Sequence, residues 1–102
     1  MRIIKKLAEQ MEDEVQGTLE YIKDALDLKS IDPELSKMYY EMAKEEQKHM
    51  QRLHDQAEKK IRETREAMGE PPQKMLNKWE DKHRKLMAQE AEARMYIELY
   101  ER

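Results

Sequence analysis

Glu46 and His49 are the residues whose types and spacing most clearly indicate metal binding in this chain. They stand three positions apart, so on an α-helix their side chains point to the same side. A carboxylate and an imidazole together suit iron or manganese. Both residues also fall on an apolar stripe at helical spacing, which contains Leu35, Tyr39, Met42 and Leu53. Because a carboxylate in such a stripe must be paired, protonated or bound to a metal, something has to compensate Glu46.

The elements that position these residues are three long helices. Apolar periodicity and stop signals predict helices over about residues 3–28, 33–68 and 72–101. Asp32 is a good N-cap for the second helix, and Pro33 suits its first position. Gly69 is expected to end that helix, with Pro71 and Pro72 blocking its continuation. The short first connection makes the first two helices an antiparallel hairpin.

Glu14 is expected to face Glu46 across this hairpin. The turn centres near Ser30, and both glutamates lie sixteen residues from it, so they stand at the same height. The hairpin would therefore bring Glu14, Glu46 and His49 to one point as metal ligands and catalytic residues. This is half of a di-iron site, which takes a Glu from each of two helices and Glu-x-x-His from each of two others. A two-fold dimer of hairpins would supply the other half and complete a four-helix bundle.

Composition limits the class of protein. The 102 residues suit a single all-α domain over 1–102, and with 38% hydrophobic residues the chain is expected to oligomerise to bury a core. A net charge of −3, with basic and acidic residues interleaved, argues against nucleic-acid binding. No apolar run reaches membrane-spanning length, no signal-peptide core is present and there are no cysteines, so we expect a cytoplasmic protein without disulfides.

The segment 8–58 resembles the ferritin-like superfamily of ferritins, rubrerythrins and encapsulated ferritins. The resemblance rests on Glu14 with Tyr21 seven residues on, on the helix start at residues 32–35, and on the run 45–49. The layout of one hairpin plus a third helix is most similar to encapsulated ferritins, which build their iron site between subunits. The resemblance implies that Glu14, Glu46 and His49 bind two iron ions per dimer, with manganese possible, and that Tyr21 is a neighbouring aromatic residue.

The expected activity is oxidation of Fe(II) by dioxygen or peroxide, for iron storage or detoxification, in a homodimer or higher homo-oligomer. The alternative is a structural or interaction protein that keeps the helical bundle without turnover, in which Glu46 and His49 belong to a buried polar network that fixes helix register. The charged third helix favours this alternative, because its apolar stripe needs a partner. We expect that stripe to pack between neighbouring subunits.

Other polar residues are expected to lie outside the main site. Glu80 and His83 repeat the Glu-x-x-His spacing, but a fold about Gly69 would place them level with residues 55–58, roughly 9–14 Å from His49. Glu90 lies closer in height and is a less favoured candidate for an outer ligand. His54 is expected to be solvated.

Overall fold

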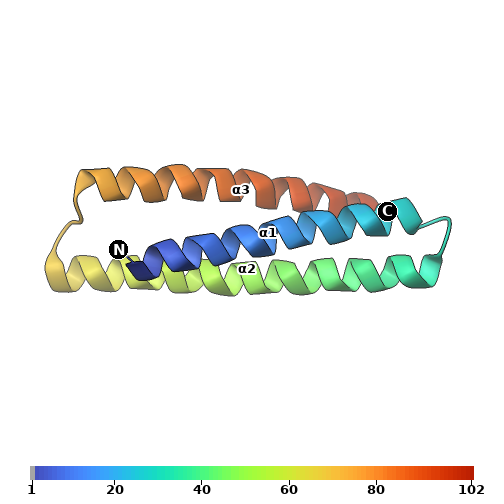
Figure 1. The fold of residues 1–102 in the computed structure, drawn as a ribbon, viewed down its shortest axis with the longest axis horizontal. Coiled ribbons are helices and arrows are strands. Elements are labelled where there is room, and N and C mark those ends of the chain that lie inside the picture. Colours follow the sequence, from blue (N-terminus) through green and yellow to red (C-terminus); the bar gives the residue numbers. More distant parts are fainter. Residues whose placement is uncertain (1) are drawn as a thin grey trace.

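The computed structural model describes residues 2–102, and over this range the chain forms three long α-helices (Figure 1). They are α1 (Arg2–Leu28), α2 (Pro33–Met68) and α3 (Gln73–Glu101), so the predicted bounds are confirmed to within one residue. The helices lie side by side in a rod of 55 × 19 × 18 Å. Within residues 2–102, no helix is both long and apolar enough to cross a membrane.

The predicted caps hold both ends of α2. The Asp32 side chain accepts a hydrogen bond from the Leu35 N–H at 3.1 Å, and Pro33 occupies the first turn, where no N–H is needed. At the other end Gly69 adopts a φ of 81°, in the left-handed region that favours glycine. Its N–H donates to the Arg65 carbonyl at 2.9 Å. These caps set the length of α2 and therefore the height of its side chains against α1.

The buried stripe of α2 lies one position further along the sequence than the stripe expected from its large apolar residues. The fully buried residues of this helix are Ser36, Ala43, Met50 and Ala57. Because three of these side chains are small, α1 can approach α2 closely along this line. The expected stripe instead lies along one border of the hairpin. Its members are half-buried, except for His49, which is exposed. We call it the edge stripe, and it consists of Leu35, Tyr39, Met42, Glu46, His49 and Leu53.

Helix α3 packs against the hairpin of its own chain. Leu86 and Ala93 belong to the same core cluster as Met11 and Met50, and Ile97 joins a second cluster with Ile22, Ala25 and Ala43. Figure 1 shows α3 running beside α1 for most of its length. The expectation that its apolar stripe packs between neighbouring subunits is therefore wrong. The hairpin has a second apolar face, besides the one that carries Glu14 and Glu46, and the prediction did not include it.

The C-terminal end of α3 is fastened beside the hairpin turn. The Ser36 and Tyr100 hydroxyl groups lie within hydrogen-bonding distance at 3.4 Å, and the Lys29 ammonium donates to the Tyr100 carbonyl at 2.5 Å. The Tyr40 ring stacks on Tyr100 with a centroid separation of 4.6 Å. The Tyr40 hydroxyl also donates to the Glu101 carboxylate, which raises the pKa of Tyr40 to about 12 because ionisation would break that hydrogen bond. At the opposite end of the rod, no residue from 58 to 85 is fully buried.

Candidate metal centre

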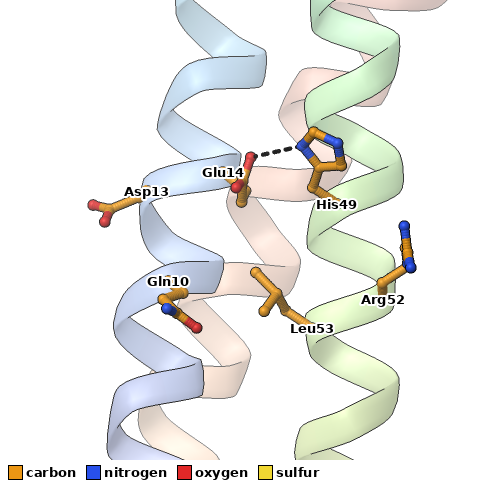
Figure 2. A pocket seen from close by; sticks show the side chains of 6 residues that line it. All are labelled: Gln10, Asp13, Glu14, His49, Arg52 and Leu53. Carbon is orange, nitrogen blue, oxygen red and sulfur yellow. Dashed lines mark ion pairs between the residues drawn. The ribbon is translucent and has the colours of Figure 1, made fainter.

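Glu14, Glu46 and His49 converge at one point on the hairpin, as their heights predicted. The His49 Nδ1 atom lies 3.5 Å from Glu14 Oε2 and 3.6 Å from Glu46 Oε1. One ligand atom from each residue falls within 4.8 Å of the others. Figure 2 shows Glu14 on α1 reaching toward His49 on α2. We call this group the carboxylate cluster.

Gly17 makes room for the carboxylate cluster. A Cβ atom built at this glycine would stand 2.8 Å from Glu46 Oε2, which is closer than real Cβ contacts. A glycine inside a helix costs roughly 1 kcal/mol relative to alanine. The chain tolerates that cost where the Glu46 carboxylate presses against α1. Gly17 was not among the predicted site residues, although a glycine three positions after Glu14 in a long helix was the available signal.

The surroundings of the cluster favour the protonated form of Glu46. A hydrogen bond with Glu14, together with burial and the negative charge of Glu14, raises the pKa of Glu46 from 4.5 to about 7. His49 lowers this pKa and so offsets part of the shift. Among the residues that the structure describes, Glu14 Oε2 is the one buried side-chain oxygen or nitrogen without a hydrogen-bond partner. An oxygen in this position favours a proton or a cation as its partner.

The carboxylate cluster opens to the outside. It borders a pocket whose lining includes Gln10, Asp13, Arg52 and Leu53 (Figure 2). The side chain of His49 is 50% exposed, whereas those of Glu14 and Glu46 are 25% and 26% exposed. In Figure 2, α3 passes behind the hairpin on the side away from the pocket. The cluster thus lies on a face that the chain's own third helix leaves free.

The remaining candidates of the sequence analysis lie elsewhere. Tyr21 packs against Tyr39, with ring centroids 6.0 Å apart, about two turns along α1 from Glu14. Glu90 pairs with Arg94 on its own helix, and Glu80 is exposed. None of these residues belongs to a group of potential metal ligands within residues 2–102.

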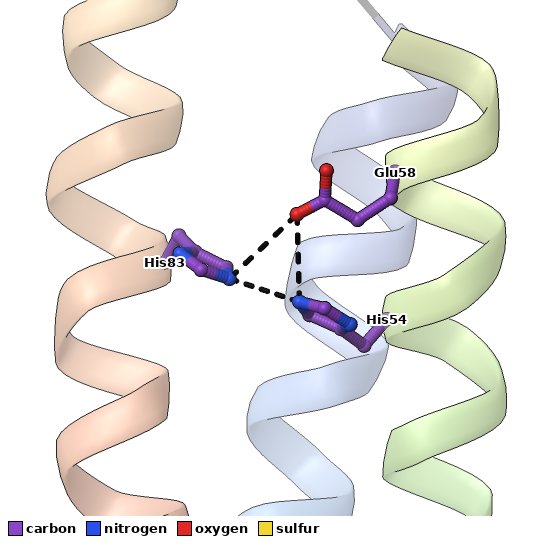
Figure 3. A group of neighbouring side chains, drawn as sticks. All are labelled: His54, Glu58 and His83. Carbon is purple, nitrogen blue, oxygen red and sulfur yellow. Dashed lines mark hydrogen bonds and ion pairs between the residues drawn. The ribbon is translucent and has the colours of Figure 1, made fainter. Parts of the chain in front are cut away.

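A second group of potential ligands lies between α2 and α3, and it consists of His54, Glu58 and His83 (Figure 3). We call it the histidine cluster. His83 does lie level with Glu58, as the height argument placed it. The expectation of a solvated His54 is wrong, because its side chain is only 20% exposed and its ring stacks on that of His83. The sequence signal for this position was weak, because His54 follows Leu53 by one residue and therefore does not belong to the edge stripe.

Comparison of the chain with family models, with curated proteins and with solved structures finds no match.

Proposed function

We propose that this protein is a ferritin-like di-metal protein that oxidises Fe(II) at a site shared between two subunits. The observation that carries the proposal is the carboxylate cluster, in which two carboxylates and one imidazole from opposite helices of a hairpin converge. The buried Glu14 Oε2 atom, which has no hydrogen-bond partner, fits a cation held among these side chains, and the absence of a side chain at Gly17 leaves room for the Glu46 carboxylate. Two carboxylates and one imidazole are a donor set suited to iron or manganese.

The cluster is half of a di-metal site, and a second copy of the chain would supply the other half. Three ligands from each copy make four carboxylates and two imidazoles, which is the ligand set of ferritin-like di-iron proteins. The edge stripe supports this arrangement, because its residues alternate at spacings of four and three along α2, as in helices that pack side by side. Its apolar members are half-buried within one chain and would be covered in the four-helix bundle.

The residues of the cluster have distinct roles in this proposal. Glu14, Glu46 and His49 would hold the metal ions, which when bound supply electrons to dioxygen or peroxide. Because the pKa of Glu46 is about 7, its proton is readily displaced when a cation arrives. As substrate, two Fe(II) ions lose one electron each. With two protons, these electrons reduce dioxygen to hydrogen peroxide, or hydrogen peroxide to two water molecules.

A structural role without turnover is the second candidate, and one observation favours it. His49 lies within ion-pair distance of both carboxylates, so a protonated His49 would compensate their charge without a metal. The cluster would then fix the register of α1 against α2.

Metal content and Fe(II) oxidation distinguish the two candidates. We expect about two iron or manganese ions per dimer in protein purified without added metal. Glu46→Ala and His49→Ala should each remove the metal and abolish the oxidation of added Fe(II) in air, measured by ferric absorbance. Glu80→Ala is the matched control, because Glu80 is an exposed member of the other Glu-x-x-His pair, and it should behave as wild type. Equal metal content and oxidation rate in all four proteins would refute the proposal and favour the structural role.

A further inference from the structure

The histidine cluster presents three ligand atoms that point at one another from two helices. His54 Nε2 lies 2.9 Å from His83 Nε2 and 3.5 Å from Glu58 Oε1, and His83 Nε2 lies 3.9 Å from the same oxygen. Figure 3 shows His54 and Glu58 reaching from α2 toward His83 on α3. All three histidines of the chain thus belong to one or other of the two clusters.

We propose that His54, Glu58 and His83 form a second metal site, which binds Zn²⁺ or another borderline divalent transition-metal ion and fastens α3 to α2. This inference does not rest on the function proposed for the carboxylate cluster. Two imidazoles and one carboxylate are a ligand set of mononuclear zinc and transition-metal sites, with the remaining positions left to water.

The separations fit a common ion. Ligand atoms that each bind an ion at about 2.0–2.1 Å stand about 2.9–3.4 Å apart in octahedral or tetrahedral geometry. The 2.9 and 3.5 Å separations from His54 Nε2 are close to this range, and the 3.9 Å separation closes with a small rotation of the Glu58 side chain, which is 48% exposed. Two neutral imidazoles and one carboxylate carry a single negative charge, so a divalent cation is favoured electrostatically.

The surroundings orient the imidazole of His54 for this role. Its Nδ1 atom faces Asp55 Oδ1 at 3.6 Å, and the Gln51 amide donates to the same oxygen at 2.9 Å. A carboxylate beside one ring nitrogen favours the tautomer that leaves the other nitrogen free as a ligand. The His83 ring is held between His54 and Trp79, whose ring centroids lie 5.1 and 5.4 Å away.

The position of the site gives the bound ion a structural consequence. Helix α3 packs mainly against α1, and the histidine cluster is one of the places where it touches α2 directly. It also stands at the border of the segment 58–85, which has no fully buried residue. An ion held by both helices would connect the two ends of this segment. The segment would then gain less conformational entropy when it unfolds locally.

Trp79 allows this site to be tested in the intact chain, because it is the only tryptophan and lies beside His83. Chelator-treated full-length protein is titrated with Co²⁺, whose partly filled d shell quenches a nearby indole, and Trp79 fluorescence is followed. We expect saturable quenching at one Co²⁺ per chain, competed by Zn²⁺. His54→Gln and His83→Gln should each weaken the apparent affinity at least about tenfold, since the loss of even an outer-shell partner costs that much.

The third histidine provides the matched control. His49→Gln alters the carboxylate cluster alone, so it should quench as wild type does. Circular dichroism establishes that each variant keeps its helices, and Zn²⁺ should raise the melting temperature of wild type and His49→Gln by more than that of His83→Gln. Absence of saturable quenching in wild type, or equal quenching in wild type and His83→Gln, would overturn the proposal and leave a hydrogen bond between two histidines.

Discussion

The carboxylate cluster and the histidine cluster use the same two ligand types in opposite proportions and on different faces of α2. The first has two carboxylates and one imidazole on a face that α3 leaves open, and the second has two imidazoles and one carboxylate against α3. In our proposal the histidine cluster has all of its protein ligands within one chain. The carboxylate cluster has a buried oxygen without a hydrogen-bond partner and is completed, in our proposal, only by a second chain. In our two proposals, α2 thus carries two sites that differ in metal preference and in the number of subunits they need.

The largest expected difference between the clusters is in assembly. If the carboxylate cluster is shared between subunits, chelation should raise the dimer dissociation constant by about tenfold or more, because metal that binds only the dimer stabilises it by mass action. The metal-free protein should also associate more weakly at about pH 8 than at about pH 6, since Glu46, whose pKa is raised to about 7, loses its proton as pH rises and its two copies then repel each other. Sedimentation velocity at several dilutions, with chelator or Mn²⁺, measures both effects.

The control for assembly is His83→Gln, which alters the site within one chain and should dimerise as wild type does. Association that responds to neither metal nor pH would mean that Glu14, Glu46 and His49 do not meet across a subunit boundary.

The parts of this structure that depend on local sequence signals and on segment length could be predicted from the sequence. Asp32, Pro33 and Gly69 fixed the ends of α2, and equal numbers of residues from the turn placed Glu14 opposite Glu46. The core stripe of α2 was displaced by one position because Ala43 and Ala57 are small, and small residues at a close helix contact resemble surface alanines in a sequence. The histidine cluster was missed because contact between His54 and His83 depends on where α3 packs. That packing is tertiary information that periodicity within one helix does not contain.

A smaller expected difference between the clusters is their contribution to the pH dependence of the free energy of unfolding of the metal-free chain. Folding raises the pKa of Glu46 from 4.5 to about 7, so the folded state binds a proton more tightly than the unfolded state does. The stability from this proton is complete below about pH 4.5 and is lost as pH rises through 7. We expect the free energy of unfolding to fall by about 1–2 kcal/mol between pH 5 and 8, allowing for partial solvent exposure of Glu46.

Urea unfolding of chelated protein across this pH range measures the slope. Glu46→Gln should flatten it, because the amide neither gains nor loses a proton. Glu58→Gln is the matched control, since Glu58 faces two histidines instead of a second carboxylate. Equal slopes in wild type and Glu46→Gln would mean that a group other than Glu46 binds this proton.

The smallest expected effect concerns the space at Gly17. Gly17→Ala gains roughly 1 kcal/mol of helix propensity but places a Cβ atom against Glu46 Oε2, so the stability of the metal-free chain should change little. Displacing this carboxylate should weaken Mn²⁺ binding several-fold by calorimetry while leaving Co²⁺ quenching of Trp79 unchanged. Gln16→Ala, at the exposed neighbouring position, should alter neither. Unchanged Mn²⁺ affinity in Gly17→Ala would show that the carboxylate cluster does not need this space.

The absence of fully buried residues between positions 58 and 85 has a consequence for native-state hydrogen exchange. Helix ends usually exchange fastest, but here the last turn of α3 is held by Tyr100 beside the hairpin turn and carries the buried Ile97 nearby. The amides of the segment 58–85, in the middle of the sequence, should instead open first and as one cooperative unit. Protection should therefore be high in the last turns of α3 and low in the segment 58–85.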